Sequence, residues 1–119
     1  MSYVDGYVLP VPRANLAAYR RLARKAGRIW KEHGALAYVE CVADDVQPGK
    51  LTSFPQAVKL KPDEVVVFAW IVFRSRRARD RINALVMKDP RLADMADPKR
   101  LPFDARRMFW GGFKPIIEL

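Results

Sequence analysis

The nine residues VVVFAWIVF, from Val65 to Phe73, decide the fold because no charged or polar side chain interrupts them. A strand with one face in water alternates apolar and polar side chains, whereas a strand covered on both faces is apolar throughout. This stretch therefore predicts a strand that has other parts of the protein packed against each of its two faces.

Three further segments have the composition of β-strands, and they are Tyr3–Pro10, Ala35–Val42 and Arg106–Phe113. They contain β-branched and aromatic residues, which favour strands. Pro10 and Pro12 are expected to end the first strand, because proline has no N–H to donate to a sheet. In the last strand, Gly111 and Gly112 indicate a bulge or a close backbone approach.

Two segments have the periodicity of amphipathic helices. The first runs from Asn15 to His33, with Asn15 as the expected N-cap and Gly34 as the left-handed residue that ends the helix. The second is expected to begin after Ser75, whose hydroxyl can cap it. Arginine and lysine side chains fill the polar face of the first helix. Its apolar stripe contains Leu16, Tyr19, Leu22, Ala23, Ala26, Ile29 and Trp30.

Residues 43–64 follow neither periodicity and contain prolines and a glycine. A connection of this length is uncommon in a compact domain, so it is a candidate functional or dimer-contact loop. Ser53 and Pro55 can begin one helical turn within it. The pairs Asp89–Pro90 and Asp97–Pro98 each have the pattern of an N-cap followed by proline at the first helical position, and they predict further short helical turns.

In chain order the elements are strand, helix, strand, strand, helix and strand, within one domain of residues 1–119. This is the split βαβ arrangement of the ferredoxin-like α+β fold, an antiparallel sheet with both helices on one face. Two helices cover only one side of the sheet, yet the strand from Val65 to Phe73 is apolar on both. Since a soluble protein rarely leaves a large apolar face in water, we expect a second copy to cover it in a homodimer.

Composition limits the location and the partners of the protein. The formal net charge of +9 makes this a basic protein and favours anionic partners without naming one. No apolar run reaches the roughly 20 residues of a membrane span, and the first residues lack the pattern of a signal peptide. A single cysteine cannot form an intramolecular disulfide, so a cytoplasmic location is expected.

Four segments together resemble an uncharacterised bacterial family, the domain-of-unknown-function family 1428. They are YVDGYVLPVP (Tyr3–Pro12), KEHGALAYVECVADDV (Lys31–Val46), GKLTSFPQAVKLKPDEVVVFAWI (Gly49–Ile71) and LPFDARRMFWGGFKP (Leu101–Pro115). Its members resemble the dimeric α/β barrel superfamily, in which two ferredoxin-like protomers press their open sheet faces together. That superfamily includes cofactor-free monooxygenases, haem-degrading enzymes and stress-responsive proteins. The resemblance therefore implies the fold and the dimer, and it leaves the activity open.

Two carboxylates, Asp5 and Glu40, are candidate catalytic residues because they occupy the middle of strands, where acidic residues are uncommon. Asp5 shares a strand face with Tyr7, and Glu40 shares one with Tyr38. If these faces form the open side of the sheet, both acids point into the dimer cavity, where an apolar setting raises their pKa and suits them to proton transfer. The alternative is an ion pair with Arg106 or Arg107. The expected ligand-binding residues are Tyr7, Tyr38, Trp70, Arg107 and Trp110.

The only histidine and the only cysteine, His33 and Cys41, are interpreted as structural residues. His33 falls in the last turn of the first helix, where a protonated imidazole suits the helix dipole. Cys41 shares a strand face with Ala37 and Val39, and we expect that face to look toward the helices and to bury the thiol. No CxxC or HxxxH spacing occurs, so neither a metal nor a cofactor is expected.

Two functions are compatible with these features, and whether the protein is an enzyme stays open. The first is the binding or conversion of a small molecule in a cavity on the open sheet face. The alternative is binding of nucleic acid, RNA in particular, through a basic helical face. The residues expected to serve that alternative are Arg20, Arg21, Arg24, Arg28, Arg76 and Arg77.

Overall fold

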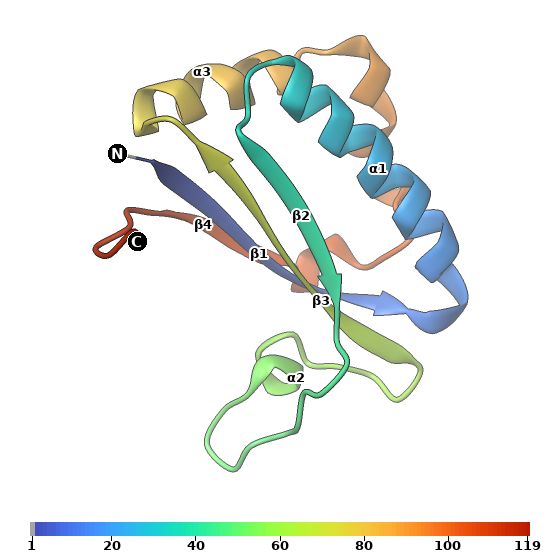
Figure 1. Ribbon diagram of the computed structural model, residues 1–119. Coiled ribbons are helices and arrows are strands. Elements are labelled where there is room, and N and C mark those ends of the chain that lie inside the picture. Colours follow the sequence, from blue (N-terminus) through green and yellow to red (C-terminus); the bar gives the residue numbers. More distant parts are fainter. Residues whose placement is uncertain (1) are drawn as a thin grey trace.

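A computed structural model, which describes residues 2–119, has one antiparallel sheet with the strand order β2-β3-β1-β4. Its strands are β1 (Tyr3–Pro12), β2 (Ala37–Val42), β3 (Glu64–Phe73) and β4 (Phe109–Phe113). The two long helices, α1 (Leu16–Glu32) and α3 (Arg76–Met87), lie on one side of the sheet, and the short helix α2 (Phe54–Ala57) lies on the other (Figure 1). This arrangement is the ferredoxin-like α+β fold, so the predicted fold class is confirmed.

The strand β3 lies in the interior of the sheet, paired with β1 on one side and β2 on the other. Toward the helices, Ile71 and Phe73 join one core cluster and Val67 joins another. Toward the opposite side, Val66 packs against Val58 from the loop around α2. The uninterrupted apolar sequence of β3 is explained by these contacts, because both of its faces carry apolar side chains.

Small residues bring α1 close to the sheet. Ala23 and Ala26 are buried in the two helix-side clusters, and Gly27 lies directly over the ring of Tyr38. Larger side chains at the end of the helix, Ile29 and Trp30, fill the core between α1 and α3. The predicted apolar stripe therefore faces the sheet, and the arginines and lysines between its members face outward.

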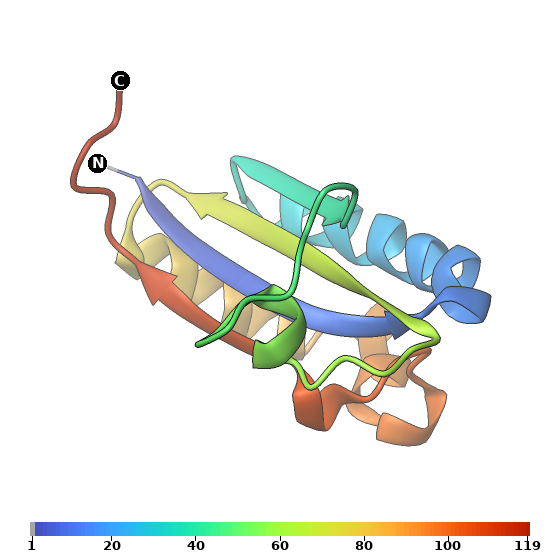
Figure 2. The same ribbon diagram turned by 90° about the horizontal axis from the view of Figure 1, so that it is seen from below.

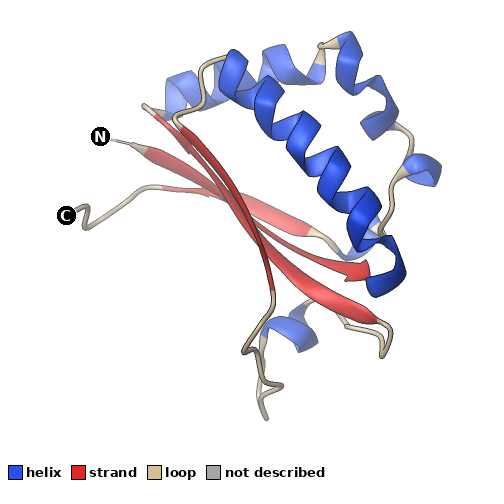
Figure 3. Cartoon of the chain, turned by 45° about the vertical axis from the view of Figure 1, so that its right-hand side comes forward, coloured by secondary structure: helices blue, strands red, loops and turns tan. Residues whose placement is uncertain are grey.

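Serine and aspartate caps begin the helices where the sequence indicates. The Ser75 hydroxyl accepts the Ala78 N–H at 3.1 Å to start α3, and the Ser53 hydroxyl accepts the Gln56 N–H at 3.2 Å to start α2. Asp89 and Asp97 cap two 3₁₀ segments, Pro90–Ala96 and Pro98–Arg100, which connect α3 to β4 on the helix side (Figure 3). Asn15 occupies the N-cap position of α1 as predicted, but its side chain makes no capping hydrogen bond, and its amide donates to the carbonyl of Pro102 instead.

Four strand boundaries differ from those predicted, and in two of them the shift is small: β2 begins at Ala37 instead of Ala35, and β3 begins one residue earlier, at Glu64. The strand β1 continues through Pro10 to Pro12, because β4 pairs with β1 only from Val4 to Val8, and beyond that point one side of β1 needs no N–H donor. The last strand begins at Phe109 instead of Arg106. The Asp104 carboxylate accepts the Arg106 N–H at 3.1 Å and holds residues 105–107 in a 3₁₀ turn before the strand starts.

One face of the sheet remains largely uncovered, and we call it the open face. Figure 2 looks onto it and shows α2 and its loop crossing in front of only part of the sheet. Beside the covered part, Phe68 is 42% exposed and Phe113 is 62% exposed. No helix within residues 2–119 combines the length and the apolar character needed to span a membrane. The open face contains Val4, Gly6, Val39, Cys41, Phe68, Trp70, Val72, Phe109 and Phe113.

The contact between Gly27 and Tyr38 gives a test of this packing. A Cβ atom at Gly27 would lie 2.6 Å from Cδ1 of Tyr38, closer than real atoms approach. Overpacking of this kind costs about 1–3 kcal/mol, so Gly27→Ala should lower the free energy of unfolding despite the higher helix propensity of alanine. Urea denaturation measures the change. Gly6→Ala is the control, since its Cβ would lie 3.8 Å from Phe113. A Gly27→Ala variant as stable as the wild type would contradict the described packing.

Candidate functional site

Asp5 and Glu40 both point toward the helices. Asp5 is completely buried, and its Oδ2 accepts a hydrogen bond from Asn83 of α3 at 3.1 Å. Glu40 accepts a hydrogen bond from the hydroxyl of Tyr19, on α1, at 2.5 Å. The prediction that these two acids face the open side of the sheet is therefore wrong. The physical reason is that polar side chains on α1 and α3, Tyr19 and Asn83, supply the hydrogen-bond donors that these carboxylates need on the helix side.

The cysteine is also oriented opposite to the prediction. Cys41 is aligned with Phe68 in the pairing of β2 and β3, so it belongs to the open face and is partly exposed. His33 lies at the end of α1, as expected, with Nε2 at 2.9 Å from Oδ2 of Asp89. Hydrogen bonds from Arg91 and His33 hold the pKa of Asp89 well below its usual range. This histidine thus joins the end of α1 to the segment that follows α3.

Asp5 belongs to a buried polar network that joins both helices to β1. The Trp30 indole N–H donates to Oδ1 of Asn83 at 2.9 Å, and the Asn83 amide donates to Asp5. The Arg79 Nε lies 3.6 Å from Oδ1 of Asp5, and its Nη2 donates to the hydroxyl of Tyr3. Burial raises the pKa of Asp5, while the Asn83 hydrogen bond and the Arg79 charge oppose the rise. The predicted alternative of an ion pair is right in kind, but the partner is Arg79 instead of Arg106 or Arg107.

Gly112 makes room for this network at the edge of the sheet. It is aligned with Asp5 across β1 and β4, and a Cβ atom there would collide with the Tyr3 hydroxyl and the Arg79 guanidinium. The close approach that the two glycines predict near the end of the chain is therefore present at Gly112. Because its members are committed to one another and buried, we assign the Asp5 network to stability instead of ligand binding.

Glu40 is surrounded differently, by two tyrosines and an open groove. The hydroxyls of Tyr19 and Tyr38 donate to separate oxygens of Glu40, at 2.5 and 2.7 Å. Burial and the charge of Glu40 raise the pKa of both tyrosines, so both stay protonated and act as donors. Tyr7 lies two strands away, with the small side chain of Ala69 between it and Glu40 in the sheet register. Burial raises the pKa of Tyr7 as well.

The groove beside Glu40 runs between α1 and the edge strand β2 and has a volume of about 1370 Å³; we call it the α1–β2 groove. The surface of the groove is mostly apolar, with contributions from Leu16, Ala23, Val42 and Val67. Its acids are Glu40 and Glu32, and Glu32 is already paired with Arg91 at 2.7 Å. Its cations are Arg20, Arg21, Arg24, Arg28 and Lys31.

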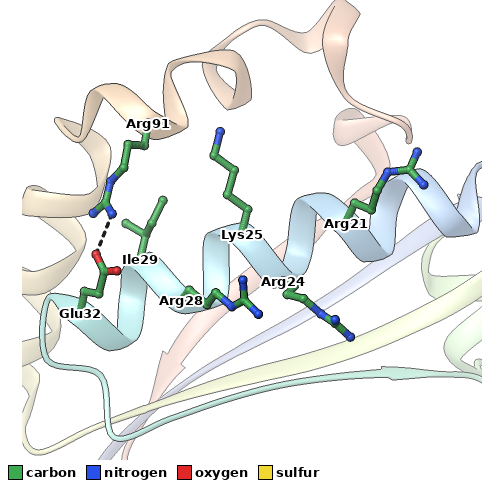
Figure 4. A pocket seen from close by; sticks show the side chains of 7 residues that line it. All are labelled: Arg21, Arg24, Lys25, Arg28, Ile29, Glu32 and Arg91. Atoms are coloured by element: carbon green, nitrogen blue, oxygen red, sulfur yellow. Dashed lines mark ion pairs between the residues drawn. The ribbon is translucent and has the colours of Figure 1, made fainter.

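The cations of α1 do not all point the same way. In Figure 4, Lys25 points toward the segment that carries Arg91, whereas Arg24 points away from it, toward the strands. A smaller hollow of about 290 Å³ lies between α1 and that segment, and Arg91 in it is held by Glu32 and Asp89. Lys25 lines this hollow and not the groove. The ion pairs among residues 2–119 leave Arg20, Arg24 and Arg28 without an acidic partner.

The remaining predicted site residues are dispersed. Tyr7 stacks on Trp110 on the helix side at 5.7 Å, while Trp70 lies on the open face beside Phe68 at 5.6 Å. The expectation of one ligand pocket shared by Tyr7, Tyr38, Trp70 and Trp110 is therefore not met, because the strand alternation places Trp70 on the other side of the sheet.

Arg107 connects several segments of the structure through hydrogen bonds. Its predicted place among the ligand-binding residues is therefore wrong. Its Nη1 and Nη2 donate to the two oxygens of buried Glu64 at 2.7 and 2.6 Å, and the same guanidinium donates to Asp104 and to two loop carbonyls. Arg76 and Arg77 begin α3 and do not line the groove. The periodicity of the first helix assigns Tyr19 to the apolar stripe and misses its bond to Glu40. Since a buried tyrosine hydroxyl needs a partner, that hydroxyl is the sequence signal for a nearby acceptor.

The comparisons with known proteins concern the family and the fold. A family model described as a protein of unknown function, DUF1428, matches residues 2–105. The uncharacterised protein YbaA of Escherichia coli K12 is 48% identical over 118 residues, which cover 99% of each chain.

Among solved structures, a dimeric ferredoxin-like protein from an uncultured marine organism has a TM-score of 0.62 at 10% identity, with 100% of each chain covered. SnoaB, a cofactor-independent oxygenase from Streptomyces nogalater, has a TM-score of 0.54 at 14% identity and covers 99% of this chain and 96% of its own. At such identities these two structures support the fold alone.

The buried pair of Asp5 and Arg79 predicts a pH-dependent loss of stability. Arg79→Met leaves the Asp5 charge buried without its cation, which typically costs about 3–5 kcal/mol. The folded-state pKa of Asp5 is already raised above the unfolded value of 3.8 and should rise further in the variant. A folded state with the higher pKa binds the proton more tightly, so its stability falls as pH rises from the unfolded pKa through the folded one.

Urea unfolding at pH 4 and at pH 7 therefore should show a larger cost of Arg79→Met at pH 7. The control is Arg76→Met, since Arg76 is exposed and forms only a 3.8 Å pair with Asp80. Equal costs for Arg79→Met at the two pH values would contradict an ionised Asp5 that depends on Arg79.

Proposed function

The chain belongs to the family of proteins of unknown function DUF1428, and on that premise we propose that it forms a homodimer and binds a small organic anion in the α1–β2 groove of each protomer. The dimer places the open face between the two copies. The groove then remains accessible at the outer edge of each sheet, beside α1. The proposal moves the ligand from the open face, where the sequence suggested it, to the helix side.

The open face supports the homodimer. Phe54 of α2 packs against Phe68, which in turn contacts Trp70, with ring centroids 5.9 and 5.6 Å apart, and Phe54 and Phe68 are still 47% and 42% exposed. Contiguous apolar surface of this kind marks an interaction site in a soluble protein. A structural neighbour of the same fold is described as dimeric. A second copy is the occupant that offers the same apolar surface in return, through a two-fold interface.

A charge on the open face should therefore prevent dimerisation. Phe68→Asp places a carboxylate at a position that is 42% exposed in one protomer and covered in the dimer, and we expect it to convert a dimer into a monomer at micromolar concentration. Size-exclusion chromatography with light scattering gives the mass. Leu85→Asp, at a 45% exposed position on α3, is the matched control and should stay dimeric. A monomeric wild-type protein would overturn the dimer.

The balance of charges in the groove is the main observation that favours an anionic ligand. Five cations and two acids line it, one acid is paired with Arg91, and the other already accepts hydrogen bonds from two tyrosines. The unpaired guanidinium groups suit a carboxylate, which arginine can bind with two parallel hydrogen bonds. The apolar surface suits a hydrocarbon body, and Glu40 can accept a hydrogen bond from a ligand hydroxyl. The ligand class is therefore a hydroxylated organic acid.

The probe 4-hydroxyphenylacetate has these three features and tests the groove by NMR titration. Arg24→Gln and Glu40→Gln should each weaken its binding at least about tenfold, since a hydrogen bond to a charged group contributes about 1.5–3 kcal/mol. Lys25→Gln is the control on the same helix, because Lys25 does not line the groove, and it should leave the affinity within about twofold. Binding that is unchanged in both groove variants would contradict the site.

The fold is compatible with such a function without a cofactor. The structural neighbour SnoaB is a cofactor-independent oxygenase, and that activity belongs to SnoaB. For this chain we propose binding, with Glu40 as the group placed to take a proton if the ligand is also converted. The predicted role of Asp5 as a second catalytic acid is not part of the proposal, because Asp5 is enclosed by its own network.

Nucleic acid is the second candidate, and the unbalanced charge of α1 is the observation that favours it. Like charges four residues apart, as at Arg20 and Arg24 or Arg24 and Arg28, destabilise a helix by about 0.2–0.5 kcal/mol per pair. A polyanion would relieve this repulsion. Fluorescence anisotropy with mixed single-stranded RNA should then show binding that falls steeply with salt and that Lys25→Gln also weakens. No binding at low salt would eliminate this candidate.

A further inference from the structure

The segment after β4, residues 114–119, extends away from the body of the protomer beside the start of β1 (Figures 1 and 2). We call it the C-terminal arm. Ile116 is 95% exposed and Ile117 is 75% exposed, and Leu119 is fully exposed. A hydrogen bond of 2.6 Å from the Ser2 hydroxyl to Glu118 connects the arm to the start of the chain. The arm thus presents three aliphatic side chains in water.

Leaving these side chains in water forgoes a substantial free energy. Burial of one isoleucine or leucine side chain contributes about 1.5–3 kcal/mol. Single exposed apolar residues are ordinary on protein surfaces, but consecutive ones on a projecting segment form a patch that marks a contact with another molecule. Pro115 restricts the backbone at the root of the arm and has no N–H to pair in a strand, so β4 ends there.

The root of the arm adjoins the open face. Phe109 and Phe113 of β4 are aligned with Val8 and Val4 of β1, so the two phenylalanines lie on the open side of the sheet. Phe113 directly precedes the arm and is itself 62% exposed. Exposed apolar side chains therefore follow one another along the chain from Phe109 and Phe113 on the open face to Ile116 and Ile117 in the arm. In Figure 2 the arm leads off this surface instead of folding back across it.

We propose that each C-terminal arm packs against the open face of a second copy, in a reciprocal exchange between the two protomers. The inference rests on the proposed homodimer and adds that the C-terminal arm contributes to the contact between its two protomers. A second copy fits the arm because its open face offers aromatic and aliphatic surface, with Phe68 and Trp70 as the largest exposed members on β3. Lys114 and Glu118 lie on either side of Ile116 and Ile117 in the sequence, so the charged side chains of the arm fall at the margin of the proposed contact. A two-fold interface contains this contact twice, so one substitution in the arm removes two contacts from each dimer.

Sedimentation equilibrium of the 119-residue chain tests the contribution of the arm. The double variant Ile116→Asp/Ile117→Asp should raise the dimer dissociation constant at least about a hundredfold, since each protomer loses two buried aliphatic contacts. The matched control is Lys114→Gln/Glu118→Gln, which removes the two charges of the arm and should change the constant less than about threefold. Because the arm is exposed in a single protomer, neither variant should alter the far-ultraviolet circular dichroism spectrum.

A photo-crosslinking residue at position 117 tests where the arm lies. We expect a covalent dimer whose crosslinked peptide contains residues from the open face of β2 or β3. Crosslinks confined to the same protomer, or directed to α1 or α3, would overturn the proposal.

The two levels of the proposal fail in different ways. If the wild-type chain is dimeric and the Ile116→Asp/Ile117→Asp variant dimerises equally well, the arm does not contribute and the homodimer stands. If the wild-type chain is monomeric, both the homodimer and the arm exchange are wrong. Dimerisation that the Lys114→Gln/Glu118→Gln control weakens as much as the aspartate variant would also overturn the apolar contact.

Discussion

The structure depends on one constraint, which is that a four-stranded sheet with two apolar faces has long helices on only one of them. The interior strand β3 cannot bury both faces within one protomer, because α2 and its loop contact the open face only around Val66 and Phe68. The two sides of the sheet therefore serve different purposes. The helix side holds the core and the polar networks, and the open face is left for contact with another molecule.

The helix side accommodates Asp5 and Glu40 by giving each one hydrogen-bond donors, although Oδ1 of Asp5 and Nε of Arg79 face each other at 3.6 Å without a hydrogen bond. Asp5 is enclosed by Asn83 and Arg79 and joins α3 to β1, whereas Glu40 is held by two tyrosines at the edge of an accessible groove. Because Asp5 is enclosed and Glu40 borders an accessible groove, we interpret Asp5 as a stabilising residue and Glu40 as a candidate binding residue. The helix α1 contributes to both purposes, since its small residues allow close packing on β2 while its arginines reach the groove beside that strand.

Much of the fold could be predicted from the sequence because it depends on local signals. The periodicity of α1, the cap at Ser75 and the apolar run of β3 each act over a few residues, and the structure confirms them. The orientation of β1 and β2 could not be predicted in the same way. Alternation separates Asp5 from Val4 but does not say which faces the helices, because both faces of the sheet are apolar. The deciding contacts come from distant side chains such as Asn83 and Tyr19, which no short-range pattern connects to the strands.

The reactivity of a single thiol on the interior strand of the open face tests the division between the two faces most directly. Val72 of β3 lies on that face and is partly exposed, and it does not line the α1–β2 groove, whereas Cys41 does. In a Cys41→Ser/Val72→Cys variant, the rate of reaction with a maleimide can be followed over a range of protein concentrations and compared with the rate in urea. If a second copy covers the open face, the thiol reacts far more slowly at concentrations where the protein is dimeric, and Phe68→Asp restores rapid reaction. A rate close to that of the unfolded chain at every concentration would contradict the account, because the open face would then lie in water.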